Sequence, residues 1–142
     1  FLLAPESATL SPFPTIEGER VLNIPGETVF SGWLVKATVM RREQMAAEEN
    51  DLTVYLALDK VAGSLLVRSR QPGDRFQPLG MSQTKELAEF MIDAKIPRAW
   101  RQKVPIVCSP EHIIWVAGWR MDERAKVTGD TEQVLRLEFE RA

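Results

Sequence analysis

The chain has 142 residues, of which 44% are hydrophobic, and this size and composition suit one domain with a single core. A charged fraction of 27% and four tryptophans argue against disorder, and no apolar run approaches the roughly twenty residues of a membrane-spanning helix. The net charge of -2 gives the chain no overall attraction to nucleic acid, so any such affinity requires a local concentration of cations.

Cysteine usage indicates a reducing compartment. Cys108 is the only cysteine, so the chain alone can form neither an internal disulfide nor a thiolate metal cluster. We therefore expect a soluble, cytoplasmic protein without a metal site or a membrane contact. The first residue is Phe1 rather than Met, which leads us to expect a piece of a longer protein.

Prolines mark the first part of the chain as a linker or lead-in. Residues 1–14 contain Pro5, Pro12 and Pro14, and proline removes a backbone donor and restricts the residue before it. The remaining residues, 15–142, are expected to form a single domain.

Two strands joined by a tight turn are predicted next. Residues 20–24 and 27–40 flank Pro25-Gly26, a pair typical of a turn because it supplies a fixed and then a positive φ. The period of two in the second strand predicts one inward face, made of Val29, Trp33, Val35, Ala37 and Val39.

The middle of the chain continues the sheet. Residues 41–51 are charged and predict a loop or a short exposed helix. Residues 52–58 and 64–70 are rich in β-formers, and the connection between them is long enough for a hairpin, which would extend the sheet to four strands.

Helical spacing follows the Pro72-Gly73 turn. One buried stripe recurs at i, i+3, i+4 and i+7, namely Leu87, Phe90, Met91 and Ala94. Thr84 is the expected N-cap. The helix should stop near Ile96, because Pro97 cannot continue its hydrogen bonds but can begin a second short helix that runs to Lys103.

Three more strands are predicted toward the end of the chain. Residues 104–108 and 111–119 flank Ser109-Pro110, and the second segment is apolar on both faces, so it should be central and bury Trp115 and Trp119. Residues 133–140 alternate as a half-buried closing strand does. The fold class is therefore α+β, with mixed or antiparallel sheet and two short helices packed outside it.

Basic residues are concentrated in the middle of the chain. The stretch 60–103 has a net charge of about +5, and the flanks are acidic. This asymmetry fits one localised surface that faces phosphates, although an ordinary solvated face would have the same composition.

The turn after residue 70 concentrates these cations. Arg68 and Arg70 project to the same side of a strand, and the turn at Gly73 can bring Arg75 and Phe76 alongside. Such a surface suits phosphates and unstacked bases. The residues alone leave open a structural alternative, in which Asp74 pairs with one of the arginines to lock the turn and Phe76 belongs to the core.

These residues and those that follow resemble the C-terminal signature of tRNA(Ile)-lysidine synthetases, which covers about residues 64–127. The order and spacing of several blocks match, and the blocks are Arg68-x-Arg70-x-x-Gly73-Asp74-Arg75-Phe76, Leu79-Gly80-Met81, Lys85-x-Leu87, Phe90, Ile92-Asp93-x-Lys95-Ile96-Pro97-Arg98, Arg101, Pro105, Ile113-Ile114-Trp115-Val116-x-Gly118 and Arg120. The family often has paired lysines at the start of the helix, where this chain has Lys85-Glu86.

The resemblance implies an ATP-dependent enzyme that activates the wobble cytidine of tRNA(Ile) and joins lysine to it in an N-terminal PP-loop domain. This sequence has no such loop, so ATP and Mg²⁺ are expected for the parent enzyme and no cofactor for this fragment. The implied partners are tRNA(Ile), the PP-loop catalytic domain of the same chain and a possible second copy in a homodimer. The implied fold is a β-sandwich that resembles a domain of the phenylalanyl-tRNA synthetase β subunit.

The expected site is a tRNA-binding surface without catalytic residues. Its binding residues are Arg68, Arg70, Arg75, Phe76, Lys85, Lys95, Arg98 and Arg101, and its structural turn residues are Gly73, Asp74 and Gly80. Trp100 is a further candidate contact, and Lys103 belongs to the same basic cluster at the junction of the two helices.

Two other functions remain open from the sequence. The chain could be a structural or dimerisation module of the same enzyme without direct RNA contact. It could also be an editing-type hydrolase, but this depends on fold analogy, and only Cys108 and His112 could serve as nucleophile and base.

Overall fold

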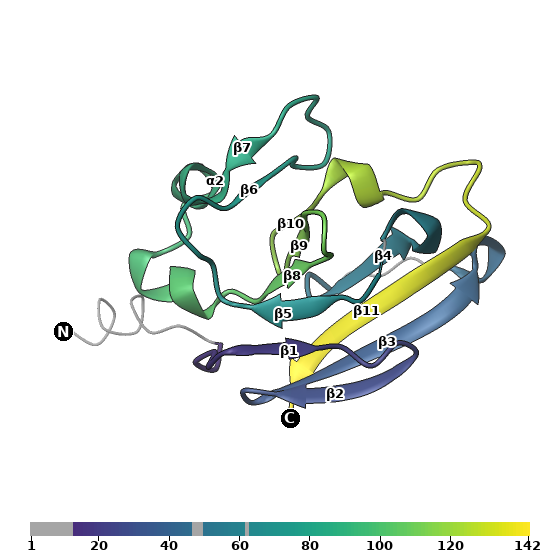
Figure 1. Ribbon diagram of the computed structural model, residues 1–142, viewed down its shortest axis with the longest axis horizontal. Coiled ribbons are helices and arrows are strands. Elements are labelled where there is room, and N and C mark those ends of the chain that lie inside the picture. The colour runs from purple at the N-terminus through teal and green to yellow at the C-terminus, as the bar shows by residue number, and fades with distance from the viewer. Residues whose placement is uncertain (1–12, 47–49, 62) are drawn as a thin grey trace.

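The computed structural model describes residues 13–46, 50–61 and 63–142, which form two antiparallel sheets and a small hairpin (Figure 1). The five-stranded sheet contains, in spatial order, β1 (Glu19–Val21), β5 (Leu66–Arg68), β8 (Ile106–Cys108), β9 (Ile113–Val116) and β10 (Arg120–Met121). The four-stranded sheet contains, in spatial order, β2 (Gly26–Phe30), β3 (Trp33–Arg41), β11 (Gln133–Arg141) and β4 (Thr53–Ala57).

Short elements connect and cover these sheets. The hairpin of β6 (Arg75–Phe76) and β7 (Lys85–Glu86) leads into helix α2 (Leu87–Asp93). The 3₁₀ helices are η1 (Arg42–Gln44), η2 (Leu58–Lys60), η3 (Arg98–Lys103) and η4 (Glu123–Ala125). None of the helices in the described residues is long and apolar enough to cross a bilayer.

The first core lies between the two sheets. Phe139 on β11 contacts Trp33 of its own sheet and Trp115 of the five-stranded sheet, each at a ring-centroid distance of 5.5 Å and nearly edge to face. Both sheets contribute further buried aliphatic side chains to this layer, including Leu135 and Val67. The sheets therefore form a β-sandwich, as the resemblance implied.

The second core lies on the other face of the five-stranded sheet. Phe76, Leu87, Phe90, Met91 and Ile96 pack there against β8 and β9. In β9, Ile114 and Trp115 belong to the first core, whereas Ile113 and Val116 belong to the second. The prediction of a central strand that is apolar on both faces is therefore confirmed, and the reason is that the sheet is covered on both sides.

The first predicted hairpin is wrong. β1 pairs with β5 rather than with the next strand, and the hairpin is formed by β2 and β3 around Ser31-Gly32, both of which have positive φ (49° and 84°). A two-residue turn of this kind places Phe30 opposite Trp33, so Phe30 faces the core and Val29 faces solvent. The expectation that Val29 points inward is therefore also wrong.

The second predicted hairpin is wrong for a similar reason. β4 pairs with β11 in the four-stranded sheet, and β5 pairs with β1 and β8 in the five-stranded sheet, so η2 and the residues after it connect the two layers. The strand predicted at 133–140 is confirmed as β11, although it is a central strand between β3 and β4 and does not close a sheet.

The short exposed helix expected within 41–51 is η1, and residues 47–49 lie outside the described residues. The lead-in at 1–14 also lies outside them, apart from Phe13 and Pro14.

Helix α2 has the predicted buried stripe but different ends. It starts after Glu86, because Lys85 and Glu86 pair with β6, so Thr84 is not its N-cap. It ends in a Schellman motif, in which the N–H groups of Lys95 and Ile96 donate to the carbonyls of Ile92 and Met91. Lys95 accordingly has a φ of 59°. The expected second helix after Pro97 is the 3₁₀ helix η3.

Candidate nucleic-acid interface

The turn between β5 and β6 is fixed by an arginine–aspartate pair. The Arg68 guanidinium donates two hydrogen bonds to the carboxylate of Asp74, at 2.8 and 3.0 Å, and its side chain is only 14% exposed. Hydrogen bonding to Asp74 raises the pKa of Arg68 above its ordinary value. This is the structural alternative that the sequence left open, so Arg68 holds the turn and has little surface left for a phosphate.

The same turn is tied to its neighbours. The Asp74 carboxylate also accepts from the N–H of Gln71 at 2.8 Å, and its backbone carbonyl accepts from the N–H of Leu87, the first residue of α2. Gly73 has a φ of 85°, a conformation that suits glycine because it has no Cβ. Gly73 and Asp74 thus lie in the turn, where Gly73 adopts the positive φ and Asp74 accepts the hydrogen bonds.

Phe76 does not offer a stacking surface. Its side chain has no exposed area, and its ring packs edge to face against Phe90 of α2 with centroids 5.0 Å apart. The expectation that Phe76 contacts a base is therefore wrong for this conformation. Burial of a phenylalanine ring of this kind contributes on the order of 2 kcal/mol to folding, so its role is to hold the β6–β7 hairpin and α2 on the sheet.

Two predicted contact residues on the β6–β7 hairpin have local partners. Arg75 is exposed and donates weakly to Thr84, with an ion pair of 3.8 Å to Glu86. Lys85 makes a close ion pair with Asp93 on α2. The contacts of Arg75 are long and its side chain is 50% exposed, so turning it toward a phosphate costs little free energy. Lys85 would first have to break its ion pair with Asp93.

The junction between α2 and η3 carries the cations that are most available. Lys95 and Arg98 are exposed and Lys103 is half exposed, and within the described part of the chain no carboxylate lies at ion-pair distance from any of the three. We refer to Lys95, Arg98 and Lys103 as the junction cations. Unpaired cations attract phosphates more strongly than paired ones, because no intramolecular ion pair has to be broken first.

The remaining candidates lie partly inside the protein. Arg101 is half buried and its Nε donates to the carbonyl of Ile96 at 2.9 Å, so it helps to hold the junction. Arg70 is half buried, and Trp100 packs against the second core. The Nε of Arg70 and the Nε1 of Trp100 are buried and have no hydrogen-bond partner among the described atoms. Each could donate a hydrogen bond to a ligand only if its side chain first moved toward the surface.

Sequence reasoning missed the anchor of the β6–β7 loop. The carboxylate of Asp122 is completely buried and accepts from the Arg124 guanidinium and from the N–H groups of Gln77 and Arg124. Burial alone would raise the pKa of Asp122, but these hydrogen bonds outweigh it and lower the pKa below its ordinary value. The N–H of Gly80 in turn donates to Glu123, and Gly80 has a φ of 91°, which fits its expected turn role.

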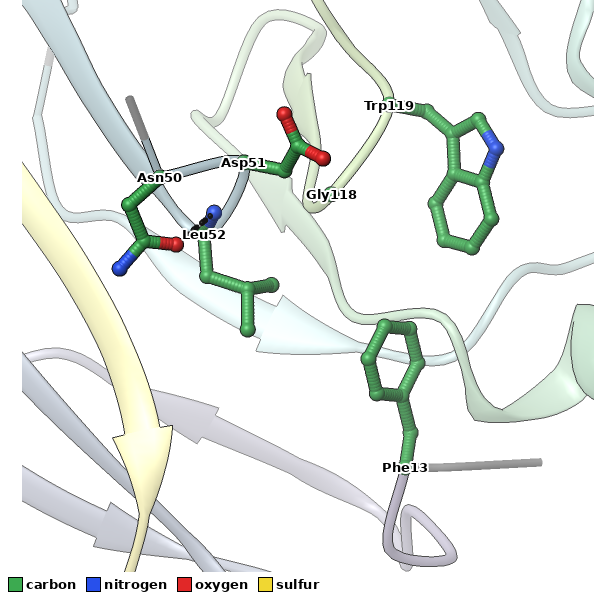
Figure 2. Close-up of a pocket in the computed structure, with 6 residues that line it drawn as sticks. All are labelled: Phe13, Asn50, Asp51, Leu52, Gly118 and Trp119. Atoms are coloured by element: carbon green, nitrogen blue, oxygen red, sulfur yellow. Dashed lines mark hydrogen bonds between the residues drawn. The ribbon is translucent and has the colours of Figure 1, made fainter. Parts of the chain in front are cut away.

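A second surface feature is an open pocket with a volume of about 510 Å³ (Figure 2). Figure 2 shows Phe13 and Trp119 on one side and Asn50, Asp51 and Leu52 on the other, with Gly118 between them. No pattern in the sequence predicts this pocket, because Phe13 lies in the predicted lead-in and the apolar strand pattern predicts a buried Trp119. The expectation for Trp119 is wrong, since its side chain is partly exposed.

Cys108 and His112 do not form a nucleophile and base pair. Burial raises the pKa of the Cys108 thiol to about 11, so it is protonated at neutral pH and a poor nucleophile. Burial, followed by the positive charge of Arg124, lowers the pKa of His112. Among the described residues, no group of three or more His, Cys, Asp or Glu side chains is arranged to hold a metal ion.

Two known proteins that are similar to this chain are both tRNA(Ile)-lysidine synthases. It is 46% identical over 92% of its length to a tRNA(Ile)-lysidine synthase from Dehalococcoides mccartyi (strain CBDB1), of which it covers 28%. It is 41% identical over 87% of its length to the tRNA(Ile)-lysidine synthase of Caldanaerobacter subterraneus subsp. tengcongensis, of which it covers 27%. The chain thus spans about a quarter of the length of these relatives.

Solved structures share the fold. A crystal structure of a TilS C-terminal domain matches 87% of this chain and 98% of its own, with a TM-score of 0.72 and 25% identity. A fragment of the phenylalanyl-tRNA synthetase β subunit from Pyrococcus horikoshii matches 61% of this chain and 27% of its own, with a TM-score of 0.53 and 19% identity, which indicates a shared fold. A family model described as the TilS substrate C-terminal domain matches residues 65–139, more than half of the chain, and the chain therefore belongs to this family.

Proposed function

We propose that this chain is the tRNA-binding C-terminal domain of a tRNA(Ile)-lysidine synthase. In this role it holds tRNA(Ile) so that a separate PP-loop catalytic domain of the same polypeptide can attach lysine to the wobble cytidine. ATP and Mg²⁺ would act in that catalytic domain, outside the quarter of the relatives' length that the chain covers.

The observation that carries the proposal is the unpaired state of the junction cations. Lys95, Arg98 and Lys103 lie within nine residues of one another in sequence, at an abrupt change of chain direction that hydrogen bonds hold in place. Fixed, exposed cations recognise the phosphates of a folded RNA by their spacing, without reading bases. Arg75 and Arg70 are the predicted residues that could extend this surface.

Binding of tRNA(Ile) to the 142-residue chain tests the proposal. Arg98→Glu should weaken binding by about tenfold at low salt, because it replaces an attraction with a repulsion, and the difference should shrink at high salt. Arg75→Glu should have a smaller effect, because its guanidinium already contacts Thr84 and Glu86.

Arg41→Glu is the matched control. Arg41 is also a well-exposed arginine, with a single weak ion pair of 3.6 Å to Glu43, but it lies at the end of β3 in the four-stranded sheet. The thermal midpoints of the variants should equal that of the parent chain. Equal losses of affinity for Arg98→Glu and Arg41→Glu would mean that binding is diffuse and that the junction is not the interface.

A dimerisation module is the second candidate, and one observation favours it. The edge strands β1 and β2 lie next to each other, since Arg20 on β1 donates to the carbonyl of Val29 on β2, and both expose a valine, Val21 and Val29. Light scattering distinguishes the two functions: a monomer that forms a complex with one tRNA supports the proposal, and a dimer without affinity for tRNA supports the alternative.

A further inference from the structure

The pocket in Figure 2 has a rigid aromatic and apolar side. The ring of Phe13 packs edge to face against Trp119, with centroids 5.9 Å apart, and it also contacts Trp33 of the first core at 5.4 Å. Leu52 on the opposite side is also apolar, and the position of a Cβ on Gly118, between the two sides, would be 3.6 Å from Leu52 and 3.7 Å from Phe13. These contacts join the wall of the pocket to the sandwich, so it does not need to be ordered by a ligand.

The side formed by residues 50–52 also carries polar groups and one charge. The side-chain oxygen of Asn50 accepts from the N–H of Leu52 at 2.8 Å, and its backbone carbonyl accepts from the N–H of Thr53 at 3.1 Å. This turn holds Asp51 at the rim, where it is exposed. Among the residues that the structure describes, the Asp51 carboxylate has neither an ion pair nor a hydrogen bond.

This combination fits a cationic side chain better than a nucleotide. Among the described residues that line the pocket, Asp51 alone is charged, so a nucleotide would bring its phosphate close to this carboxylate with no described lysine or arginine to balance it. An arginine or lysine can instead lay its aliphatic stem along Leu52 and Phe13. Its charged end can then stack on an aromatic ring and pair with Asp51.

The length of the relatives indicates where such a side chain comes from. The chain covers about a quarter of these enzymes, 28% and 27% in two of them, and the matching family is a C-terminal domain. Phe13, which forms one wall of the pocket, is also the point at which the polypeptide enters the described structure. Residues 1–12 contain no lysine or arginine, so the side chain would come from a more distant part of the preceding polypeptide, which is covalently joined to the pocket wall at Phe13.

We propose that this pocket receives an arginine or lysine side chain from the preceding part of the same polypeptide and so fastens the domain to the rest of the enzyme. The inference rests on the proposed function only in that the chain is part of a longer synthase. It adds an intramolecular contact made by residues other than the junction cations and of the opposite charge.

Photo-crosslinking in the full-length enzyme tests this inference. The photoreactive amino acid p-benzoylphenylalanine is placed at position 15, an exposed residue two positions after Phe13 of the pocket wall, and crosslinks are mapped by mass spectrometry with and without tRNA(Ile). The expected product is a crosslink to a basic segment of the same polypeptide, formed without tRNA. Asp51→Lys should reduce its yield at least fivefold, whereas Asp51→Glu should preserve most of it.

The same amino acid at position 92 provides the control. Ile92 is 58% exposed on α2, and its carbonyl accepts from the N–H of Lys95, so a probe there lies beside the junction cations and reports tRNA binding. A crosslink to tRNA from position 92 but none to the polypeptide from position 15 would overturn the docking inference and leave the proposed function intact. A crosslink from position 15 to tRNA alone would instead mean that the pocket holds a base, and this also overturns the inference. A polypeptide crosslink that is insensitive to Asp51→Lys would contradict the role of the charge.

Discussion

Asp122 shows how a single buried charge can hold a whole loop in place. Its carboxylate connects η4 to the start of the β6–β7 loop through hydrogen bonds from Arg124 and from the N–H of Gln77. The next residue, Glu123, accepts from the N–H of Gly80 at 2.9 Å and donates its own N–H to the carbonyl of Gln77 at 2.7 Å. This loop connects the strand that carries Arg75 to the strand that precedes α2, so its anchor also positions the candidate interface.

Asp122→Asn should therefore lower the free energy of unfolding by about 2 kcal/mol, because it removes the negative charge while the Arg124 guanidinium keeps its position. Asp130→Asn, at an exposed position, is the control and should change stability little. Urea unfolding at pH 7 measures both. Equal stabilities of the Asp122→Asn variant and the parent chain would show that the pair does not anchor the loop.

The dependence of this effect on pH follows from the direction of the pKa shift. The pKa of Asp122 is lower in the folded chain than its ordinary value of 3.8, so the folded state favours the ionised form. The stabilisation is then complete above the ordinary pKa and is lost as the pH falls through the folded value. The difference in thermal midpoint between the parent chain and Asp122→Asn should accordingly be constant near neutral pH and shrink below about pH 4.

At the scale of elements, the C-terminal end of α2 places a charged lysine in a strained backbone conformation. Lys95 occupies the left-handed position of the Schellman motif, where glycine is preferred, and this conformation costs a residue with a Cβ roughly 1 kcal/mol. The next residue, Ile96, is buried against the second core, so the motif cannot relax without loss of packing. A strained lysine at the candidate interface suggests that its charge is used there.

Lys95→Gly should therefore raise the free energy of unfolding by up to about 1 kcal/mol and at the same time weaken the binding of tRNA. Lys95→Ala removes the same charge but retains a Cβ, so it should weaken binding to the same extent without the gain in stability. Thermal unfolding and tRNA titration of both variants measure the two effects separately. A Lys95→Gly variant that binds tRNA as tightly as the parent chain would exclude Lys95 from the interface.

Elements defined by local periodicity could be predicted, and strand partners could not. The α2 stripe and the strands β8, β9 and β11 follow from spacing within each segment. Pairing of β1 with β5 joins residues 19–21 to 66–68, and no local pattern encodes this contact. Pro25-Gly26 resembled the hairpin turn, but the chain reverses at Ser31-Gly32, where a serine adopts a positive φ that its sequence gives no reason to expect.

The same limit applies to the candidate site. The cations around the turn were identified from the sequence, but whether each one binds a partner or a carboxylate depends on tertiary packing. Arg68 pairs with Asp74, and the Phe76 ring packs against Phe90, so both side chains hold the fold together. Lys85 pairs with Asp93, which α2 places beside it. Lys95 and Arg98, which the sequence also predicts, are exposed, and no carboxylate among the described residues lies at ion-pair distance from them.

At the scale of the whole molecule, unpaired charges of opposite sign occur at the junction and at the pocket. The net charge is -2, yet the junction cations have no carboxylate partner among the described residues, and the pocket at Trp119 has a lone carboxylate. An RNA that approaches this molecule is attracted to the junction and repelled from the acidic rim of the pocket. Charges of opposite sign fit different ligands, an RNA at the junction and a cationic side chain at the pocket.

The salt dependence of tRNA binding tests the junction most directly. The logarithm of the dissociation constant is measured against the logarithm of the salt concentration for the 142-residue chain and for the Lys95→Ala, Arg98→Ala, Lys103→Ala triple variant. Each phosphate contact contributes about 0.7 to 0.9 to the slope, so the account predicts a slope that is smaller by about 2 to 3 in the triple variant. Equal slopes in the two proteins would contradict it, because they would mean that the junction cations release no counterions from the RNA.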